Sequence, residues 1–257
     1  MLNFRNSNIL FIGLLALLIA ANFVYAIPVY VYIILGCVYL SRLFYGCYHV
    51  GSNFFIPIVC SIKTQKKIIA LSFDDGPDAI NTPNILQLLK NNNAKATFFC
   101  IGSKIEENKA ILQQTYDEGH IIGNHSFSHQ FWFDMLSKNE MIAELAMTDE
   151  VISKVIDKTP KLFRPPYGVT NPNLAKAIVD GKYTPVGWSV RSLDTVIKDE
   201  QKLLKKVINK LKPGAVFLFH DTSATTLAIL PAFLKYVKSN GYEIARLDEM
   251  LNLQAYA

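Results

Sequence analysis

From residue 67 to residue 246 the sequence alternates short apolar runs with longer amphipathic segments, and this alternation limits the fold more than any other feature. The apolar runs predict seven strands, at 67–73, 95–101, 119–124, 161–164, 184–189, 214–220 and 242–246. The segments between them have helical periodicity, at 82–92, 103–118, 139–157, 171–181, 199–212 and 223–240. Repeated strand–helix units form parallel sheets, so we expect an α/β fold. Seven strands in about 190 residues favour a small barrel over an open sheet, although spacing alone does not decide between them.

The first 60 residues differ sharply from the rest of the chain. They contain no Asp or Glu and only two Lys or Arg residues. Ile9–Tyr25 and Ile27–Tyr45 are nearly continuous apolar stretches separated by Pro28, and each is close to the roughly 20 residues that span a bilayer. We therefore predict that residues 1–60 form a membrane anchor, a hairpin of two transmembrane helices, and that residues 61–257 form the main domain.

A signal segment followed by an interfacial helix is the alternative interpretation of this region. Val24-Tyr25-Ala26 offers the small residues that a signal peptidase accepts. The long apolar continuation after Ala26 argues against simple secretion.

Charge excludes one class of partner. After residue 60 the chain carries 24 Lys and Arg against 21 acidic residues, a net charge of +3. No basic block or basic–aromatic array accompanies it, so we expect no nucleic-acid partner.

Two adjacent carboxylates, Asp74 and Asp75, follow the first predicted strand directly, and Gly76-Pro77 then starts a turn. The carboxyl ends of parallel strands are where α/β enzymes place their chemistry. Adjacent carboxylates repel, so a cation or a proton is expected between them. The alternative is a solvated pair that caps the next helix.

A histidine pair follows the third predicted strand. His125 and His129 are four residues apart, so one helical turn would bring both imidazoles to one face. Two histidines and a carboxylate form a three-ligand set of the kind that catalytic zinc uses. A chance pair on a solvated helix face is the alternative.

Three further strand ends carry polar residues. Pro165 and Pro166 stiffen the loop after Arg164, which could then hold a carboxylate in a bidentate pair, or be a solvated surface residue. His220 ends an apolar strand, and we expect it to face a cleft; the alternative is a core histidine bonded to a backbone carbonyl. Asp194 lies at another predicted strand end. Because parallel α/β folds bring strand ends together, these residues are expected to converge.

The combination resembles the polysaccharide deacetylases with the NodB homology domain, carbohydrate esterase family 4, over roughly residues 66–257. Four stretches carry the resemblance, in order and with fitting gaps: Ser72-Phe73-Asp74-Asp75-Gly76-Pro77, His125-Ser126-Phe127-Ser128-His129, Arg164-Pro165-Pro166-Tyr167 and Leu218-Phe219-His220. Ser72 stands where Thr is commoner in the family.

The resemblance implies a distorted (β/α) barrel of about seven parallel strands and one divalent metal ion, usually zinc, with cobalt or nickel as alternatives. It implies Asp75, His125 and His129 as ligands. Asp74 is then the general base, oriented by Arg164, and His220 the general acid. The Tyr167 backbone N–H would bind the oxyanion, and Tyr167 and Leu218 would line the acetyl pocket.

One family motif departs from the usual pattern. The family often has Asp-x-x-Asp-Trp where this chain has Arg191-Ser192-Leu193-Asp194-Thr195. Asp194 is kept and is expected to hold His220 in its charged, donor form. The change of Trp to Thr195 removes one apolar wall of the acetyl pocket.

We therefore expect a polysaccharide N-deacetylase that hydrolyses N-acetyl groups of N-acetylglucosamine units in peptidoglycan, another envelope polysaccharide or a chitooligosaccharide. In this chemistry a bound metal lowers the pKa of its water and polarises the carbonyl, and a group that titrates near neutrality protonates the leaving nitrogen. The alternatives are a deacylase of a small amide or an O-acetyl ester, and a non-catalytic glycan-binding scaffold of the envelope.

Localisation is expected to be the bacterial inner membrane, with the lipid bilayer as a partner through residues 1–60. Both ends of a two-span hairpin face the same side, and Arg5, Arg42, Lys63, Lys66 and Lys67 favour the cytoplasm. An envelope glycan requires an extracytoplasmic catalytic domain, which we favour, whereas a lipid-linked sugar would be reachable from inside.

Overall fold

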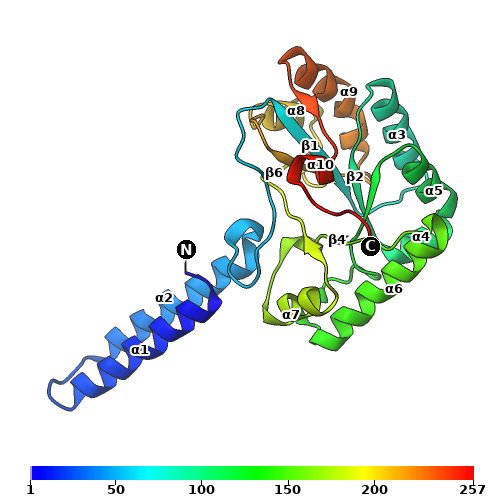
Figure 1. Cartoon of the computed structure of the whole chain (residues 1–257). Coiled ribbons are helices and arrows are strands. Elements are labelled where there is room, and N and C mark those ends of the chain that lie inside the picture. Colours follow the sequence, from blue (N-terminus) through cyan, green and yellow to red (C-terminus); the bar gives the residue numbers. More distant parts are fainter. Residues whose placement is uncertain (1) are drawn as a thin grey trace.

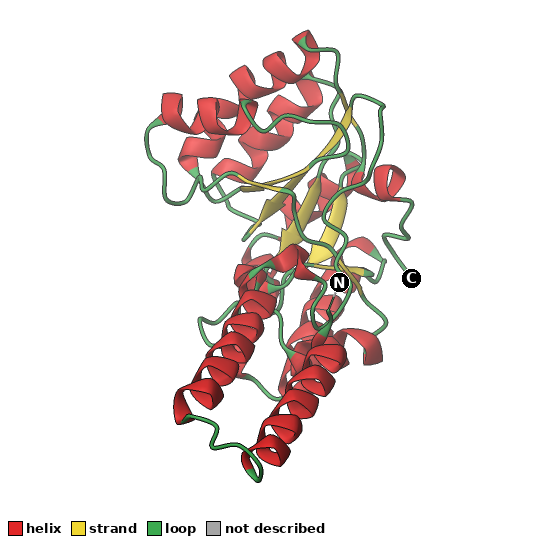
Figure 2. Ribbon diagram, turned by 90° about the vertical axis from the view of Figure 1, so that its left-hand side faces the viewer, coloured by secondary structure: helices red, strands yellow, loops and turns green. Residues whose placement is uncertain are grey.

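The computed structural model describes residues 2–257, which form an α/β domain with a helical hairpin projecting from it (Figures 1 and 2). The helices are α1 (Phe4–Asn22), α2 (Val29–Tyr48), α3 (Asn81–Asn91), α4 (Gly102–Glu107), α5 (Lys109–Asp117), α6 (Lys138–Ile156), α7 (Pro172–Asp180), α8 (Glu200–Ile208), α9 (Ala224–Ser239) and α10 (Leu247–Leu251), with 3₁₀ turns η1 (Val50–Ser52), η2 (Phe133–Met135) and η3 (Pro166–Gly168). The strands are β1 (Ile68–Asp74), β2 (Thr97–Cys100), β3 (Ile121–Asn124), β4 (Leu162–Phe163), β5 (Thr184–Pro185), β6 (Val190–Arg191), β7 (Val216–His220) and β8 (Glu243–Ile244).

Seven strands lie side by side in the order β5-β4-β3-β2-β1-β7-β6, and β8 pairs with the start of β1. Every pair is parallel. The edge strands β5 and β6 do not pair with each other within residues 2–257, so the sheet is a half-barrel. This confirms the expected distorted (β/α) barrel of about seven parallel strands.

The central strand β1 shows why the carboxylate of Asp74 lies on the inner face of the sheet. Side chains alternate along a strand, and Ile69, Leu71 and Phe73 point into the core beneath the outer helices. Fully burying an aliphatic or aromatic side chain of this size stabilises the fold by about 1.5–3 kcal/mol. Ser72 and Asp74 therefore face the other side, where both are buried.

Beyond shifts of a few residues at element ends, three elements differ from the sequence prediction. The strand expected at 184–189 is only β5, and the short strand β6 follows it separately. The helix expected at 103–118 is split at Asn108, whose backbone is non-helical (φ −125°, ψ 32°), into α4 and α5. The short helix α10 was not predicted.

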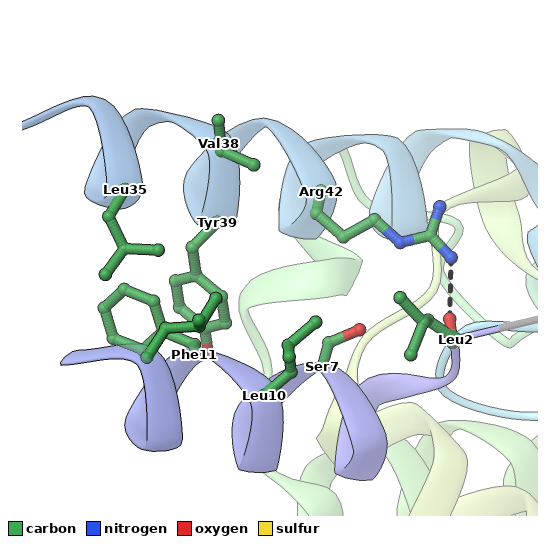
Figure 3. A pocket seen from close by; sticks show the side chains of 9 residues that line it. Leu2, Ser7, Leu10, Phe11, Leu35, Val38, Tyr39 and Arg42 are labelled. Atoms are coloured by element: carbon green, nitrogen blue, oxygen red, sulfur yellow. Dashed lines mark hydrogen bonds between the residues drawn. The ribbon is translucent and has the colours of Figure 1, made fainter. Parts of the chain in front are cut away.

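The hairpin leaves most of its apolar side chains exposed. Helices α1 and α2 are long and apolar enough to cross a membrane, and 6% of each span is buried. Their contacts with each other include the stacked rings of Phe11 and Tyr39, with centroids 4.2 Å apart, and an apolar cavity of about 170 Å³ between the helices, bounded at one end by Arg42 (Figure 3). The cavity lies within the hairpin, and its lining residues include none of the predicted site residues.

Candidate active site

The parallel register brings the ends of four strands to one place. Asp74 of β1 is opposite His220 of β7. Asn124 of β3 is opposite Phe163 of β4, so His125 and Arg164, the next residues, leave the sheet side by side. The expected convergence at the carboxyl ends of the strands therefore occurs.

Asp75, His125 and His129 form a cluster suited to a metal ion. Their potential ligand atoms lie within 4.8 Å of one another, and an oxygen of Asp75 is 3.5 Å from His125 Nε2 and 3.4 Å from His129 Nε2. Burial and the neighbouring His125 lower the pKa of His129 to about 4. Burial raises the pKa of Asp75, but contact with the three site histidines outweighs it and the net shift is downward. Neutral imidazole and ionised carboxylate are the forms that bind metal.

The imidazole of His125 is oriented as a ligand requires. Its Nδ1 lies 2.8 Å from the carbonyl oxygen of Arg164, a hydrogen bond that fixes the proton on Nδ1. Nε2 is then left with a free lone pair directed at the cluster, the arrangement common among metal-binding histidines. The donor set thus fits a divalent cation.

The histidine pair does not lie on a helix, so the helical basis of the prediction was wrong. Residues 125–129 form a loop in which Ser126 and His129 have left-handed backbone conformations (φ 65° and 48°). Glu144 of α6 holds the loop by accepting hydrogen bonds from the N–H groups of Phe127 (3.0 Å) and Ser128 (2.8 Å). The imidazole rings nevertheless meet, with centroids 4.7 Å apart.

Arg164 reaches Asp74 through a single hydrogen bond rather than the expected bidentate pair. Its Nη1 donates to Asp74 Oδ1 (2.7 Å) and to Ser72 Oγ (2.8 Å). Its Nε and Nη2 are used by backbone carbonyls, those of Val186 (3.2 Å) and Gly187 (2.8 Å). The guanidinium is fully buried and four of its five N–H groups have partners in the fold, so Asp74 is held in one orientation.

His220 is paired with Asp194 on the other side of the cleft. Its Nδ1 lies 2.7 Å from Asp194 Oδ1, and Asp194 Oδ2 accepts from the His220 backbone N–H at 2.7 Å. Burial lowers the pKa of His220, but the hydrogen bond and charge of Asp194 outweigh it and raise that pKa. The same bond outweighs burial at Asp194 and lowers its pKa. The pair therefore favours a protonated imidazole beside an ionised carboxylate.

These groups surround a cleft of about 250 Å³. It is lined by Asp74, Asp75, His125, His129, Pro165, Tyr167, Gly168, Trp188, Arg191, Thr195, Leu218 and His220. Arg164 and Asp194 lie behind the cleft wall, both fully buried. All nine predicted site residues are thus in the cleft or directly supporting it.

Tyr167 adopts a left-handed conformation (φ 58°) in η3. Its backbone N–H donates to no acceptor within residues 2–257, which leaves it available to a ligand. The Trp188 ring packs so closely on Gly168 that a Cβ there would lie 2.4 Å from it. Trp188 therefore supplies an apolar wall to the cleft in which Thr195 replaces the usual Trp.

Sequence reasoning did not identify three supporting residues. Trp188 stood at a predicted strand end, which was a usable signal, and Asn124, which accepts from the Ser126 N–H (2.9 Å), directly precedes His125. Nothing in the sequence marks Glu144 as a supporting residue, because a carboxylate within a helix is ordinarily solvated. Only the tertiary structure places the loop of residues 125–129 against it.

The half-barrel thus holds a carboxylate–histidine cluster flanked by a carboxylate bonded to Arg164 and a histidine bonded to Asp194. Comparison with known proteins agrees. The family profile described as polysaccharide deacetylase matches residues 61–186. A peptidoglycan-N-acetylglucosamine deacetylase of Bacillus cereus is 35% identical over 195 residues, covering 72% of this chain and 71% of that protein. This chain belongs to the polysaccharide deacetylase family.

Other relatives agree on the domain but differ in length. The peptidoglycan-N-acetylglucosamine deacetylase PgdA of Listeria monocytogenes is 35% identical over 202 residues, which are 79% of this chain and only 42% of PgdA. The crystal structure of the Bc1960 peptidoglycan N-acetylglucosamine deacetylase superposes with a TM-score of 0.74 at 30% identity, covering 78% of this chain and 95% of that one.

The fold also occurs without the activity. A protein of Bacillus anthracis described as a CE4 family pseudoenzyme, BA3943, matches with a TM-score of 0.70 at 28% identity, covering 75% of this chain and 68% of that one. Fold membership alone therefore does not establish turnover, and the side chains of the site carry that argument.

Proposed function

We propose that this chain is a metal-dependent enzyme that removes N-acetyl groups from N-acetylglucosamine units of an envelope glycan, with peptidoglycan as the first candidate. The observation that carries the proposal is the position of the Asp75–His125–His129 cluster between a carboxylate and an imidazole, each held by a charged partner. On one side lies Asp74, held by the buried Arg164 (2.7 Å). On the other lies His220, held by Asp194 (2.7 Å). Amide hydrolysis is assisted by a base that takes a proton from the attacking water and by an acid that protonates the leaving nitrogen.

A divalent cation, zinc in our proposal, would be held by Asp75, His125 and His129 and would supply a water of lowered pKa and polarise the acetyl carbonyl. Asp74 accepts the proton of the attacking water, because its Oδ2 faces the cluster, 3.7 Å from His125 Nε2, while Oδ1 is bonded to Arg164. The free N–H of Tyr167 donates to the developing oxyanion.

His220 completes the reaction by giving its Nε2 proton to the leaving nitrogen. Asp194 holds the opposite ring nitrogen and raises the pKa of His220, so the imidazolium is populated near neutral pH. Leu218 and Trp188 provide the small apolar surface that an acetyl methyl group needs.

Residues 1–60 are proposed to anchor the enzyme in the bacterial inner membrane, with the catalytic domain on the extracytoplasmic side. The exposed apolar faces of α1 and α2 support an anchor rather than a soluble helical pair. The peptidoglycan deacetylases among the relatives support the outer side.

The experiment is acetate release from N-acetylglucosamine oligomers and from peptidoglycan by the full chain in detergent. It is run as purified, after chelation and after zinc is added back. We expect activity that chelation removes and zinc restores, and an Asp74→Asn variant that still binds zinc but releases no acetate. Zinc bound without acetate release by the unaltered chain would contradict the proposal.

The altered motif favours one specific alternative. Arg191 and Thr195 line the cleft where the family often has Asp and Trp, so the acyl pocket of this chain differs in charge and shape. If the zinc-loaded chain hydrolyses a small acetylated amide or an O-acetyl ester but not the oligomers, the substrate is that compound. If no acylated compound is hydrolysed and glycan still binds, the chain is a scaffold.

A further inference from the structure

The helical hairpin is packed onto the catalytic domain rather than tethered to it. The Cys47 carbonyl at the end of α2 accepts a hydrogen bond from the Thr170 N–H (3.0 Å), and the Gly46 carbonyl accepts one from the Thr170 hydroxyl (3.1 Å). The connecting segment is packed as well, since Val50, Phe54 and Ile58 are buried. The orientation of the domain relative to the hairpin is therefore fixed.

The contact point is close to the catalytic cleft. Thr170 lies three residues after Tyr167, and Figure 1 shows α7, which follows it, at the end of the domain nearest the hairpin. The Asn171 side chain donates to the Asp134 carbonyl (2.6 Å), which joins η2 to the same point. A hairpin of about 20 residues per helix is about 30 Å long, the thickness of a bilayer core. Its domain end, and η2 with it, then lie at the membrane surface.

The segment around η2 exposes large apolar side chains that no other part of the described chain covers. Phe131, Trp132 and Met135 are 67%, 65% and 74% exposed, and we call residues 131–135 the aromatic loop. The Phe131 ring lies 6.0 Å from that of Tyr167, which in turn lies 4.8 Å from the His129 ring. The aromatic loop therefore runs from the hairpin contact to the mouth of the cleft.

We propose that the aromatic loop inserts into the interfacial layer of the bilayer that the hairpin spans, so that the cleft opens at the membrane surface onto glycans attached to lipid. The proposal rests on the proposed anchor and deacetylase function. Trp and other apolar side chains of this kind are favoured at the membrane interface. Because the hairpin is packed on the domain, it holds the aromatic loop at the membrane interface. This observation favours contact of the loop with lipid over stacking of the loop on a sugar.

The loop itself is tested by fluorescence of the full chain in vesicles of phosphatidylcholine and phosphatidylglycerol. The chain has two Trp residues, so Trp188→Phe leaves Trp132 as the only indole. We expect Trp132 emission that is blue-shifted relative to that of a solvent-exposed indole. We also expect this emission to be quenched when the acyl chains are brominated. The matched control carries Trp132→Phe, Trp188→Phe and Tyr236→Trp, which places one indole at an exposed position of α9, far from the hairpin in Figure 1; its emission should not change.

Trp132 emission that is insensitive to brominated lipid overturns the proposal. A change in Trp132 emission on addition of N-acetylglucosamine oligomers, without quenching by lipid, also overturns it and identifies the loop as a sugar-stacking surface. Neither result depends on turnover, so failure of the loop proposal and failure of the deacetylase proposal are distinguishable.

The distance of the cleft from the bilayer is tested with N-acetylglucosamine oligomers linked to a lipid through short or long spacers in the same vesicles. A cleft at the membrane surface should deacetylate short-spacer substrates at least as fast as long-spacer ones, and Trp132→Ser with Met135→Ser should lower that short-spacer rate about threefold while sparing soluble oligomers. A requirement for the long spacer would place the cleft away from the bilayer and overturn the proposal. No acetate from any substrate would refute the deacetylase function instead.

Discussion

His220 faces the cleft with Nε2 and contacts Asp194 with Nδ1. Because Asp194 contacts only the nitrogen that faces away from the cleft, its effect on the protonation of His220 can be tested. The Asp194 carboxylate raises the pKa of His220, and the imidazole must be protonated to act as an acid. Asp194→Asn removes that charge, so the pKa of His220 falls and the alkaline limb of the pH–rate profile should move to lower pH. The measurement is kcat/KM for acetate release across pH 5–10, with zinc saturating.

Ser192→Ala is the matched control for this change. It removes the hydrogen bond from the Ser192 hydroxyl to the Asp194 carboxylate (2.7 Å) and the one that the hydroxyl accepts from the Asp194 N–H (3.3 Å), but it keeps the carboxylate, so the alkaline limb should shift less. If Asp194→Asn lowered kcat/KM at every pH and left the alkaline limb where it is, Asp194 would act only in folding.

Arg164 is a buried charge whose partners are all fixed, and its removal should therefore be costly. Arg164→Met leaves Asp74 buried without its counter-ion, and breaking a buried pair in this way lowers the free energy of unfolding by about 3–5 kcal/mol. Activity should be lost as well, because Asp74 loses its orientation. The measurement is denaturant unfolding of the metal-loaded chain.

Lys138→Met provides the comparison, because Lys138 pairs with Asp180 at the same 2.7 Å distance on the surface. An exposed pair contributes about 0–1 kcal/mol. If the two variants were equally stable, the buried network around Arg164 would not be the support that its contacts indicate.

At the scale of elements, α6 fixes the loop that carries His125 and His129, the two proposed histidine ligands. Glu144 accepts two backbone hydrogen bonds from that loop, so Glu144→Ala should free it and weaken zinc binding by about 10–100-fold, the usual effect of losing an outer partner. Competition against a chelating indicator dye measures the dissociation constant. Glu150→Ala on the same helix removes only an exposed pair with Lys154 and should leave zinc affinity unchanged; a similar loss in both variants would point to α6 stability instead.

The elements also show what the sequence could reveal. Strand positions followed from apolar runs, and the site followed from polar residues at their ends, because a parallel sheet gathers those ends whatever the exact bounds. The loop of His125 and His129 was taken for a helix because spacing by four does not distinguish a helical turn from a loop with left-handed residues. The single bond from Arg164 to Asp74 could not be foreseen either, since Val186 and Gly187 compete for the guanidinium only in the folded chain.

At the scale of the whole molecule, α1 is an integral part of the structure. The Tyr39 hydroxyl donates to Asn8 Oδ1 (2.7 Å) and the Tyr32 hydroxyl to the Leu18 carbonyl (3.1 Å). Where α1 begins, the Phe4 N–H donates to the Phe54 carbonyl (2.9 Å) in the segment that packs on the catalytic domain. Cleavage after Ala26 would remove all of these contacts and leave α2 without its partner helix.

We therefore predict that α1 is retained in the mature protein. The chain isolated from bacterial membranes should still contain α1 when its N-terminal peptides are identified by mass spectrometry, resist extraction by alkaline carbonate and require detergent. Ala26→Glu, which blocks a signal peptidase site, should change the mass only by the substitution itself, because no cleavage occurs there. A mature chain beginning near Ile27, restored to full length by Ala26→Glu, would instead identify α1 as a signal segment. In that case the Phe4 contact would be absent from the mature chain, and only α2 would remain of the anchor that we propose.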